Sequence, residues 1–283
     1  MDRRIFLQTA AAAVVPLSAI TASYGLFEAN WLQVVRIRRS LRQLPLAFHG
    51  LKIAFLADLH HGPFTTLDYL RAVVRTTLAV QPDLIVLGGD YSLKDARYIR
   101  PCFRVLAELA APLGVYGVLG NHDYWHGLEE TRAGLAAAKI TELTNRGVWL
   151  TRGGYRLRLA GVDDLWMGRV DVAAAVGDAT AHDACIVISH NPDVAETLRD
   201  ERVGLVLSGH THGGQVVFPT GQAPFVPSRY GRKYQHGWVQ GPVAPVYVTR
   251  GLGCSGVPVR YGSRPELTLL TLDSPTALPT VTS

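Results

Sequence analysis

The sequence predicts an α/β fold, in which buried strands alternate with helices. From residue 51 onward, short apolar runs of strand length recur, and several are followed by longer segments with helical spacing of the apolar residues. Clusters containing Asp, Asn or His come directly after most of the runs. This order is typical of a largely parallel sheet whose functional side chains lie on the loops that leave the strands.

The predicted elements are short and regularly spaced. Six apolar runs are expected to be buried strands: Leu51–Ala57, Leu84–Leu87, Val115–Leu119, Cys185–Ile188, Leu205–Leu207 and Val246–Val248. Four segments are expected to be helices: Leu67–Val80, Ile99–Ala110, Leu128–Lys139 and Val194–Leu198. The C-terminal part is expected to close the sheet in an antiparallel manner. No internal repeat or second linker is found, so residues 51–273 are expected to form one domain, followed by a tail over 274–283.

The net charge of +5 is concentrated near the N-terminus. Residues 1–45 contain six arginines against two acidic residues, so the rest of the chain is nearly neutral. A nearly neutral body lacks the surplus of cations with which proteins bind duplex nucleic acid, and nucleic acid is therefore not an expected partner. The basic stretch is expected either to be solvated or to be attracted to anionic lipid headgroups.

The first thirty residues have the features of a targeting segment. The adjacent Arg3 and Arg4 precede an uncharged, Ala-rich stretch over 9–26. This pattern resembles a twin-arginine export signal, although a chance arginine pair on an ordinary secretory signal or anchor is the alternative. Residues 1–30 are thus predicted to be a signal or membrane anchor that engages the twin-arginine export machinery and touches a membrane surface. The protein would be periplasmic, extracytoplasmic or membrane-anchored. Residues 31–50 are expected to be a connecting segment or the first strand.

Residue types that bind metals follow five of the predicted strands. The seven candidate ligands are Asp58, His60, Asp90, Asn121, His190, His210 and His212. One Asp-x-His pair alone is more often a hydrogen-bonded loop, but five clusters in succession favour a metal site. Glycines before three of the ligands allow the sharp turns that bring side chains together. Mixed oxygen and imidazole ligands suit two divalent or trivalent ions, such as manganese, iron or zinc, that share one carboxylate.

The order of these motifs resembles a known family. D-x-H, G-D, G-N-H-D, H and G-H-x-H, between Lys52 and Leu272, are similar to the signature of the calcineurin-like metallophosphoesterase superfamily. The stretches 189–193, 209–215 and 250–253 resemble its YkuE/YaeI-like branch of twin-arginine-exported or membrane-associated phosphodiesterases. The resemblance implies a four-layer α-β-β-α sandwich.

The resemblance also implies roles for individual residues. It assigns one ion to Asp58, His60 and His212, the other to Asn121, His190 and His210, and the bridge between them to Asp90. A metal-bound hydroxide would attack the phosphate ester. His122 would stabilise the developing charge or protonate the leaving oxygen. Asp123 would either orient the His122 ring or cap a helix.

The substrate is less well defined by the sequence. A phosphate-ester small molecule or a lipid headgroup is expected, and cations in the C-terminal loops either hold a second phosphate or are solvated: Arg229, Arg232, Lys233, Arg250, Arg260 and Arg264. One alternative is a pyrophosphate hydrolase of lipid A metabolism that acts on a UDP-2,3-diacylglucosamine-type substrate. The alternative from another class is a non-catalytic metal-binding scaffold.

Overall fold

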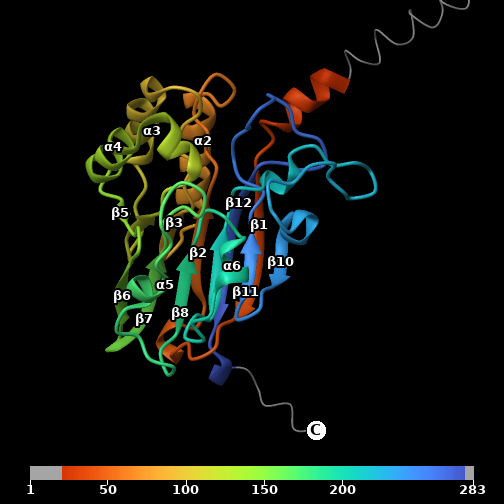
Figure 1. The fold of residues 1–283 in the computed structure, drawn as a ribbon. Helices are drawn as coiled ribbons and strands as arrows, with labels where there is room; N and C mark the ends of the chain where they lie inside the picture. Colours follow the sequence, from red (N-terminus) through yellow and green to blue (C-terminus); the bar gives the residue numbers. More distant parts are fainter. Residues whose placement is uncertain (1–20, 278–283) are drawn as a thin grey trace, which may run out of the picture.

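Two β-sheets of six strands each, packed face to face, form the centre of the molecule (Figure 1). The computed structural model describes residues 21–277. Most of the predicted export signal, residues 1–20, and the last six residues of the predicted tail lie outside the described part. Within residues 21–277, no helix combines the length and the apolar character that crossing a bilayer requires.

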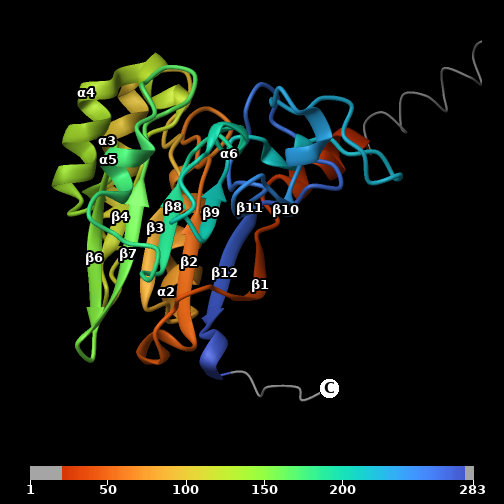
Figure 2. The ribbon, with the colours of Figure 1, turned by 60° about the horizontal axis from the view of Figure 1, so that its bottom comes forward.

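The first sheet has the strand order β1-β12-β2-β3-β4-β5. Its strands are β1 (Gln33–Ser40), β12 (Glu266–Asp273), β2 (Leu51–Leu56), β3 (Leu84–Leu87), β4 (Val115–Gly117) and β5 (Thr141–Glu142). β2, β3, β4 and β5 are parallel to one another, and β12 runs antiparallel to β2. The segment 31–50 thus supplies a strand, because β1 pairs with β12 in parallel along its whole length. Figure 2 shows β12 between β1 and β2.

The second sheet has the strand order β10-β11-β9-β8-β7-β6. Its strands are β10 (Gly237–Gln240), β11 (Pro245–Val248), β9 (Leu205–Ser208), β8 (Cys185–Ile188), β7 (Tyr155–Gly161) and β6 (Arg146–Arg152). The inner four strands are parallel, and the two edge strands are antiparallel to their neighbours. The antiparallel closure that the C-terminal sequence predicts is therefore present at β10 and β12.

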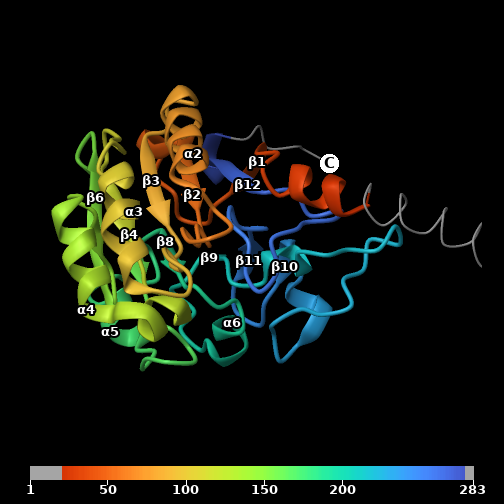
Figure 3. The ribbon, with the colours of Figure 1, turned by 90° about the horizontal axis from the view of Figure 1, so that it is seen from above.

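Helices cover the outer faces of both sheets. The helices α2 (Leu67–Ala79), α3 (Ile99–Leu106) and α4 (Asn121–Ala137) pack on the first sheet, and α5 (Val172–Val176) and α6 (Val194–Thr197) pack on the second. Figure 3 shows the sheets between α2 and α3 on one side and α6 on the other. The α-β-β-α sandwich implied by the resemblance is confirmed.

Along the central strands, successive side chains point alternately to the two faces of the sheet and so contribute to both buried layers. In β2, Ile53 and Phe55 face the second sheet, whereas Ala54 and Leu56 face the helices, and all four are fully buried. A strand that is buried on both faces reads as a continuous apolar run, which explains why β2, β3, β8 and β9 were predictable. The parallel arrangement also directs the loops that follow these strands to one end of the sandwich.

The observed helices differ from the predicted ones at their ends. α3 stops at Leu106 instead of Ala110, and α4 begins at Asn121 instead of Leu128. Gly127 interrupts α4 with a φ of 148°, which is why periodicity reveals only the part after this kink. The consequence for the site is that Asn121 and its neighbours lie on the first turn of a helix.

Candidate metal centre

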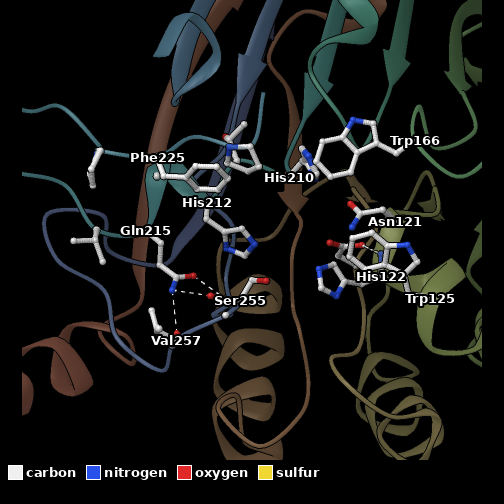
Figure 4. Close-up of a pocket in the computed structure, with 17 residues that line it drawn as sticks. Asn121, His122, Trp125, Trp166, His210, His212, Gln215, Phe225, Ser255 and Val257 are labelled. Carbon is white, nitrogen blue, oxygen red and sulfur yellow. Dashed lines mark hydrogen bonds between the residues drawn. The ribbon is translucent and has the colours of Figure 1, made fainter. Parts of the chain in front are cut away.

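The seven candidate ligands converge at the end of the sandwich where the parallel strands stop. Asp58 and His60 follow β2, Asp90 follows β3, and Asn121 begins α4 just after β4. From the second sheet, His190 follows β8, and His210 and His212 follow β9. All seven side chains are buried. Figure 4 shows His210, His212 and Asn121 pointing into a common space.

Six of the candidate ligands form two groups of potential ligand atoms, and His60, Asp90 and His122 form a third group that overlaps both. Asp58, His60 and His212 make one group and Asp90, His190 and His210 the other, and in each group the potential ligand atoms lie within 4.8 Å of one another. Asp90 reaches both groups, because its Oδ2 lies 3.2 Å from His190 Nε2 and 3.5 Å from His60 Nε2. The Oδ1 atom of Asn121 lies 3.2 Å from His190 Nε2.

The donor set fits cations. His60 Nε2 and His212 Nε2 are 3.0 Å apart, and His210 Nδ1 and His190 Nε2 are 3.1 Å apart. Ring nitrogens this close repel each other through their lone pairs unless a proton or a cation lies between them. Imidazole nitrogen and carboxylate oxygen are ligands for first-row divalent ions. The arrangement therefore suits metal binding in both groups.

The backbone of the site is held in a conformation that L-residues seldom adopt. Five of the candidate ligands have φ between 47° and 71°: Asp58, His60, Asp90, His210 and His212. Residues in the left-handed region carry conformational strain, and such strain concentrates at functional sites. Two glycines permit the close packing, since a Cβ on Gly120 would lie 2.3 Å from Asp90 Oδ1 and one on Gly209 2.4 Å from Asp58 Oδ2.

Burial and charge set the protonation of the site. Burial lowers the pKa of His60 and that of His210 to about 3, so both rings are neutral and able to ligate at pH 7. Burial alone would also lower the pKa of His190, but the Asp90 carboxylate outweighs it and raises that pKa to about 10. Burial raises the pKa of Asp58 to about 7. His190 and Asp58 must therefore release protons when a cation binds.

We expect metal affinity to rise with pH. Between pH 7 and 8.5 a cation must displace the His190 proton, so the apparent association constant should increase about tenfold per pH unit. Calorimetric titration of the metal-free protein with Mn²⁺ in buffers of different ionisation enthalpy measures both the affinity and the protons released. An affinity that stays constant over this range, with no proton release, would show that His190 is already neutral.

The sequence is similar to a family of known proteins. The model of the calcineurin-like phosphoesterase family matches residues 51–214. This chain belongs to that family. The phosphoesterase is 35% identical over 279 residues to Phosphodiesterase YaeI of Escherichia coli (strain K12), which covers 96% of this chain and 99% of YaeI. It is 32% identical over 283 residues to the uncharacterized metallophosphoesterase YkuE of Bacillus subtilis (strain 168), covering 97% and 98% of the two chains.

A solved structure is also similar to the phosphoesterase. NAD nucleotidase (NadN) of Haemophilus influenzae superposes with a TM-score of 0.48 and 16% sequence identity, over 72% of this chain and 45% of NadN. The resemblance found in the motif order is confirmed by the family match and by the two relatives. The chain is a metal-dependent phosphoester hydrolase.

The Asp123 side chain bonds backbone N–H groups in the phosphoesterase. Its carboxylate accepts hydrogen bonds from the backbone N–H groups of Asp90, Tyr91 and Gly120 at 2.8–3.0 Å, and it is fully buried. The bond from Gly120 caps α4, as the helix-cap alternative requires. Of the two roles that the sequence left open, the contacts are those of a helix cap, because position 123 is the third residue of the helix, where a carboxylate can accept hydrogen bonds from the free N–H groups. Asp123 therefore holds the Asp90 loop.

We expect Asp123→Asn to destabilise the protein by about 2–3 kcal/mol, because the amide nitrogen would face at least one buried backbone N–H that then has no acceptor. Urea unfolding of the metal-loaded protein measures this change. Asp68→Asn is the matched control, since the Asp68 side chain is 91% exposed and pairs only with Arg71; it should cost less than about 1 kcal/mol. Equal stability of the two variants would contradict the role in the Asp90 loop.

A second histidine, His126, lies beside His122 on α4. The His122 ring lies at the edge of the site, with its centroid 4.7 Å from that of His60, and its Nδ1 is 3.1 Å from His126 Nε2. The two histidines are four residues apart on α4, a spacing that places them on one helix face. Burial lowers the pKa of His122, which makes its neutral form the prevailing one at pH 7.

A buried arginine lies behind the ligand His212. Arg260 is completely buried, and its Nη2 lies 3.3 Å from His212 Nδ1. The guanidinium donates to the carbonyl oxygens of Gly253 and Ser263, so its charge is solvated by the backbone instead of by a carboxylate. Of the cations in the C-terminal loops, this one contacts a candidate ligand, and no sequence pattern distinguishes it from the others.

Proposed function

We propose that this phosphoesterase is an exported phosphodiesterase that works with two bound ions. The observation that carries the proposal is the position of Asp90, whose carboxylate contacts His60 in one ligand group and His190 in the other. Asp58, His60 and His212 would hold the first ion, Asn121, His190 and His210 the second, and Asp90 would bridge them. Manganese, iron and zinc all suit this set of ligands.

The bound ions would polarise the phosphate and activate the attacking water. The chain's own residues supply the remaining steps. With its Nδ1 engaged by His126, His122 has Nε2 left for the substrate, where the neutral ring can donate a hydrogen bond to the leaving oxygen and the protonated ring can donate a proton. Asp123 keeps the Asp90 loop and the start of α4 in register, because it bonds both.

The name of one relative supports a diester as the substrate class. YaeI, which aligns with this chain over nearly its full length, bears the name phosphodiesterase. The scaffold alternative requires lost ligands, whereas all seven candidates are present and gathered at one site. The pyrophosphate alternative requires cationic side chains for a second phosphate near the ions.

We expect variants of the site to separate metal binding from catalysis. Asp90→Ala and His210→Ala should lose both bound metal and hydrolysis of bis(p-nitrophenyl) phosphate. His122→Ala should keep the metal and lose turnover by a factor of about 10²–10⁴, the usual contribution of a positioned acid. Elemental analysis and initial rates measure the two properties.

The control for these variants is His182→Ala, because His182 is exposed and lies in the turn before β8, remote in sequence from the ligand loops. It should retain both properties. A wild-type protein that hydrolyses no phosphodiester, whether or not it takes up manganese, iron or zinc, would support the scaffold instead, and full activity in His122→Ala would remove His122 from the mechanism.

We also propose that the twin-arginine route exports the protein. It would then act in the periplasm, or anchored on the extracytoplasmic face of the membrane. The support is the Arg3-Arg4 pair ahead of an uncharged stretch. Replacing both arginines by lysine keeps the charge, yet should leave the protein in the cytoplasm. Cell fractionation with immunodetection measures this, and unchanged export of the Arg3→Lys, Arg4→Lys variant would indicate an ordinary secretory signal.

A further inference from the structure

The metal centre opens into a pocket whose outer walls are apolar. The cavity has a volume of about 390 Å³ and is bounded at its inner end by Asp90, Asn121, His122, His210 and His212. Beyond this polar end, the walls consist mainly of aromatic, aliphatic and proline side chains: Trp125, Trp166, Val216, Pro224, Phe225, Pro227 and Val257. Figure 4 shows Phe225 and Val257 on one side of the ligands and Trp125 on the other.

The tryptophan side of the pocket is fixed by hydrogen bonds and ring contacts. Asp164, which is fully buried, accepts bonds from the backbone N–H groups of Trp166 and Met167 and so shapes the turn that carries Trp166. The Trp166 ring packs edge-on against His210 with centroids 4.3 Å apart. The Trp125 ring packs against His122 at 4.6 Å. Trp166 thus borders a candidate ligand directly, and Trp125 borders the candidate catalytic residue His122.

The opposite side is fixed by Gln215, the last residue of the Gly-His-Thr-His-Gly-Gly-Gln motif. Its amide donates to the carbonyl oxygens of Ser255 and Val257 at 2.9 and 3.0 Å, and it accepts from Ser255 N–H at 2.9 Å. These three bonds hold the loop that presents Val257 beside the site. Gln215 is not a candidate metal ligand, and these hydrogen bonds explain its place in the motif.

The apolar walls are open to solvent. Exposed fractions are 71% for Phe225, 49% for Trp125, 48% for Val257 and 40% for Trp166. Exposed apolar groups gathered in a concave site mark a binding surface for an apolar ligand, since burying them against such a ligand is favourable. The surface continues directly from the groups that would hold the phosphate.

Cations are missing from this pocket. Among residues 21–277, no Lys or Arg side chain lines it. None of the six cations for which phosphate binding and solvation were both open lines it: Arg250 pairs with Glu266, Arg264 stacks on Trp31, Arg260 is enclosed behind His212, Lys233 bonds Glu196, Arg232 bonds Gln222 and lines a neighbouring cavity with Phe225, and Arg229 is exposed. A pyrophosphate or nucleoside diphosphate would place an extra charge against apolar walls, where a charge without a partner is costly.

We infer that the substrate is a phosphodiester with a single phosphate and an apolar ester group, such as an alkyl or acyl chain, which lies between the tryptophans and Phe225. The inference rests on the proposed phosphodiesterase function and adds the class of substrate. One ester oxygen leaves with the group near His122, and the apolar group occupies the outer pocket. A lipid headgroup diester and a soluble alkyl diester share this chemistry.

Soluble p-nitrophenyl alkyl phosphates test the inference. Ethyl and hexyl esters, used below their micelle-forming concentrations with the manganese-loaded protein, differ by four methylenes and carry the same reacting bond. Each fully buried methylene strengthens binding roughly fourfold. The pocket is open to solvent and should bury the four extra methylenes only in part, so kcat/KM should be at least about tenfold higher for the hexyl ester than for the ethyl ester. Vesicles containing a phosphodiester lipid then distinguish a lipid source from a soluble one.

The variant Phe225→Ser with Val257→Ser should reduce the hexyl-to-ethyl ratio to about threefold or less. Both side chains are exposed, so the fold should persist, and metal content checks it. The matched control is Phe218→Ser, because Phe218 is on the same loop as Phe225 and is 54% exposed but does not line the pocket. Its ratio should equal that of the wild type.

Three results would overturn the inference: a ratio near one in the wild type, an unchanged ratio in the double variant, or faster turnover of a p-nitrophenyl nucleotide ester or a nucleoside diphosphate ester than of the hexyl ester. No turnover of any of these esters by the metal-loaded protein would instead overturn the proposed function. The two failures are therefore distinguishable.

Discussion

One buried carboxylate connects the parts of this molecule that matter for its chemistry. Asp90 follows a strand of the first sheet, yet its Oδ2 lies 3.2 Å from His190 on the second sheet and its Oδ1 accepts the backbone N–H of His122 on α4. A buried charge is tolerated only when it is paired and hydrogen-bonded. The contacts of Asp90 therefore impose the mutual positions of three loops that are far apart in sequence.

The surrounding structure keeps the Asp90 loop in this position against backbone strain. Asp123 bonds the loop from behind, and glycines at 120 and 209 leave room for the carboxylates. A left-handed φ at five of the ligands would relax if these supports were absent. The site is thus preorganised by backbone bonds and by glycines that leave room for the carboxylates, and a cation that binds there takes the place of the proton on His190.

The sequence predicts the centre of the fold and the ligands better than the periphery. β2, β3, β8 and β9 are buried on both faces, so they appear as unbroken apolar runs, and the ligands follow them directly. β6 and β7 each contain two arginines and no apolar run longer than three residues, so no unbroken run reveals them. The direction of the Asp123 side chain depends on where α4 begins, and the apolar wall joins loops 216–227 and 255–257 through tertiary contacts. Neither is encoded in a local pattern.

The position of β12 has a consequence for how the chain is made. β12, residues 266–273, lies between β1 and β2, so β1 has no partner in the first sheet until residues 266–273 have been synthesised. The interior of that sheet is then completed through contacts between residues more than 200 positions apart, which form slowly. A chain that stopped before residue 266 would therefore leave β1 without its partner and β2 at the edge of the sheet.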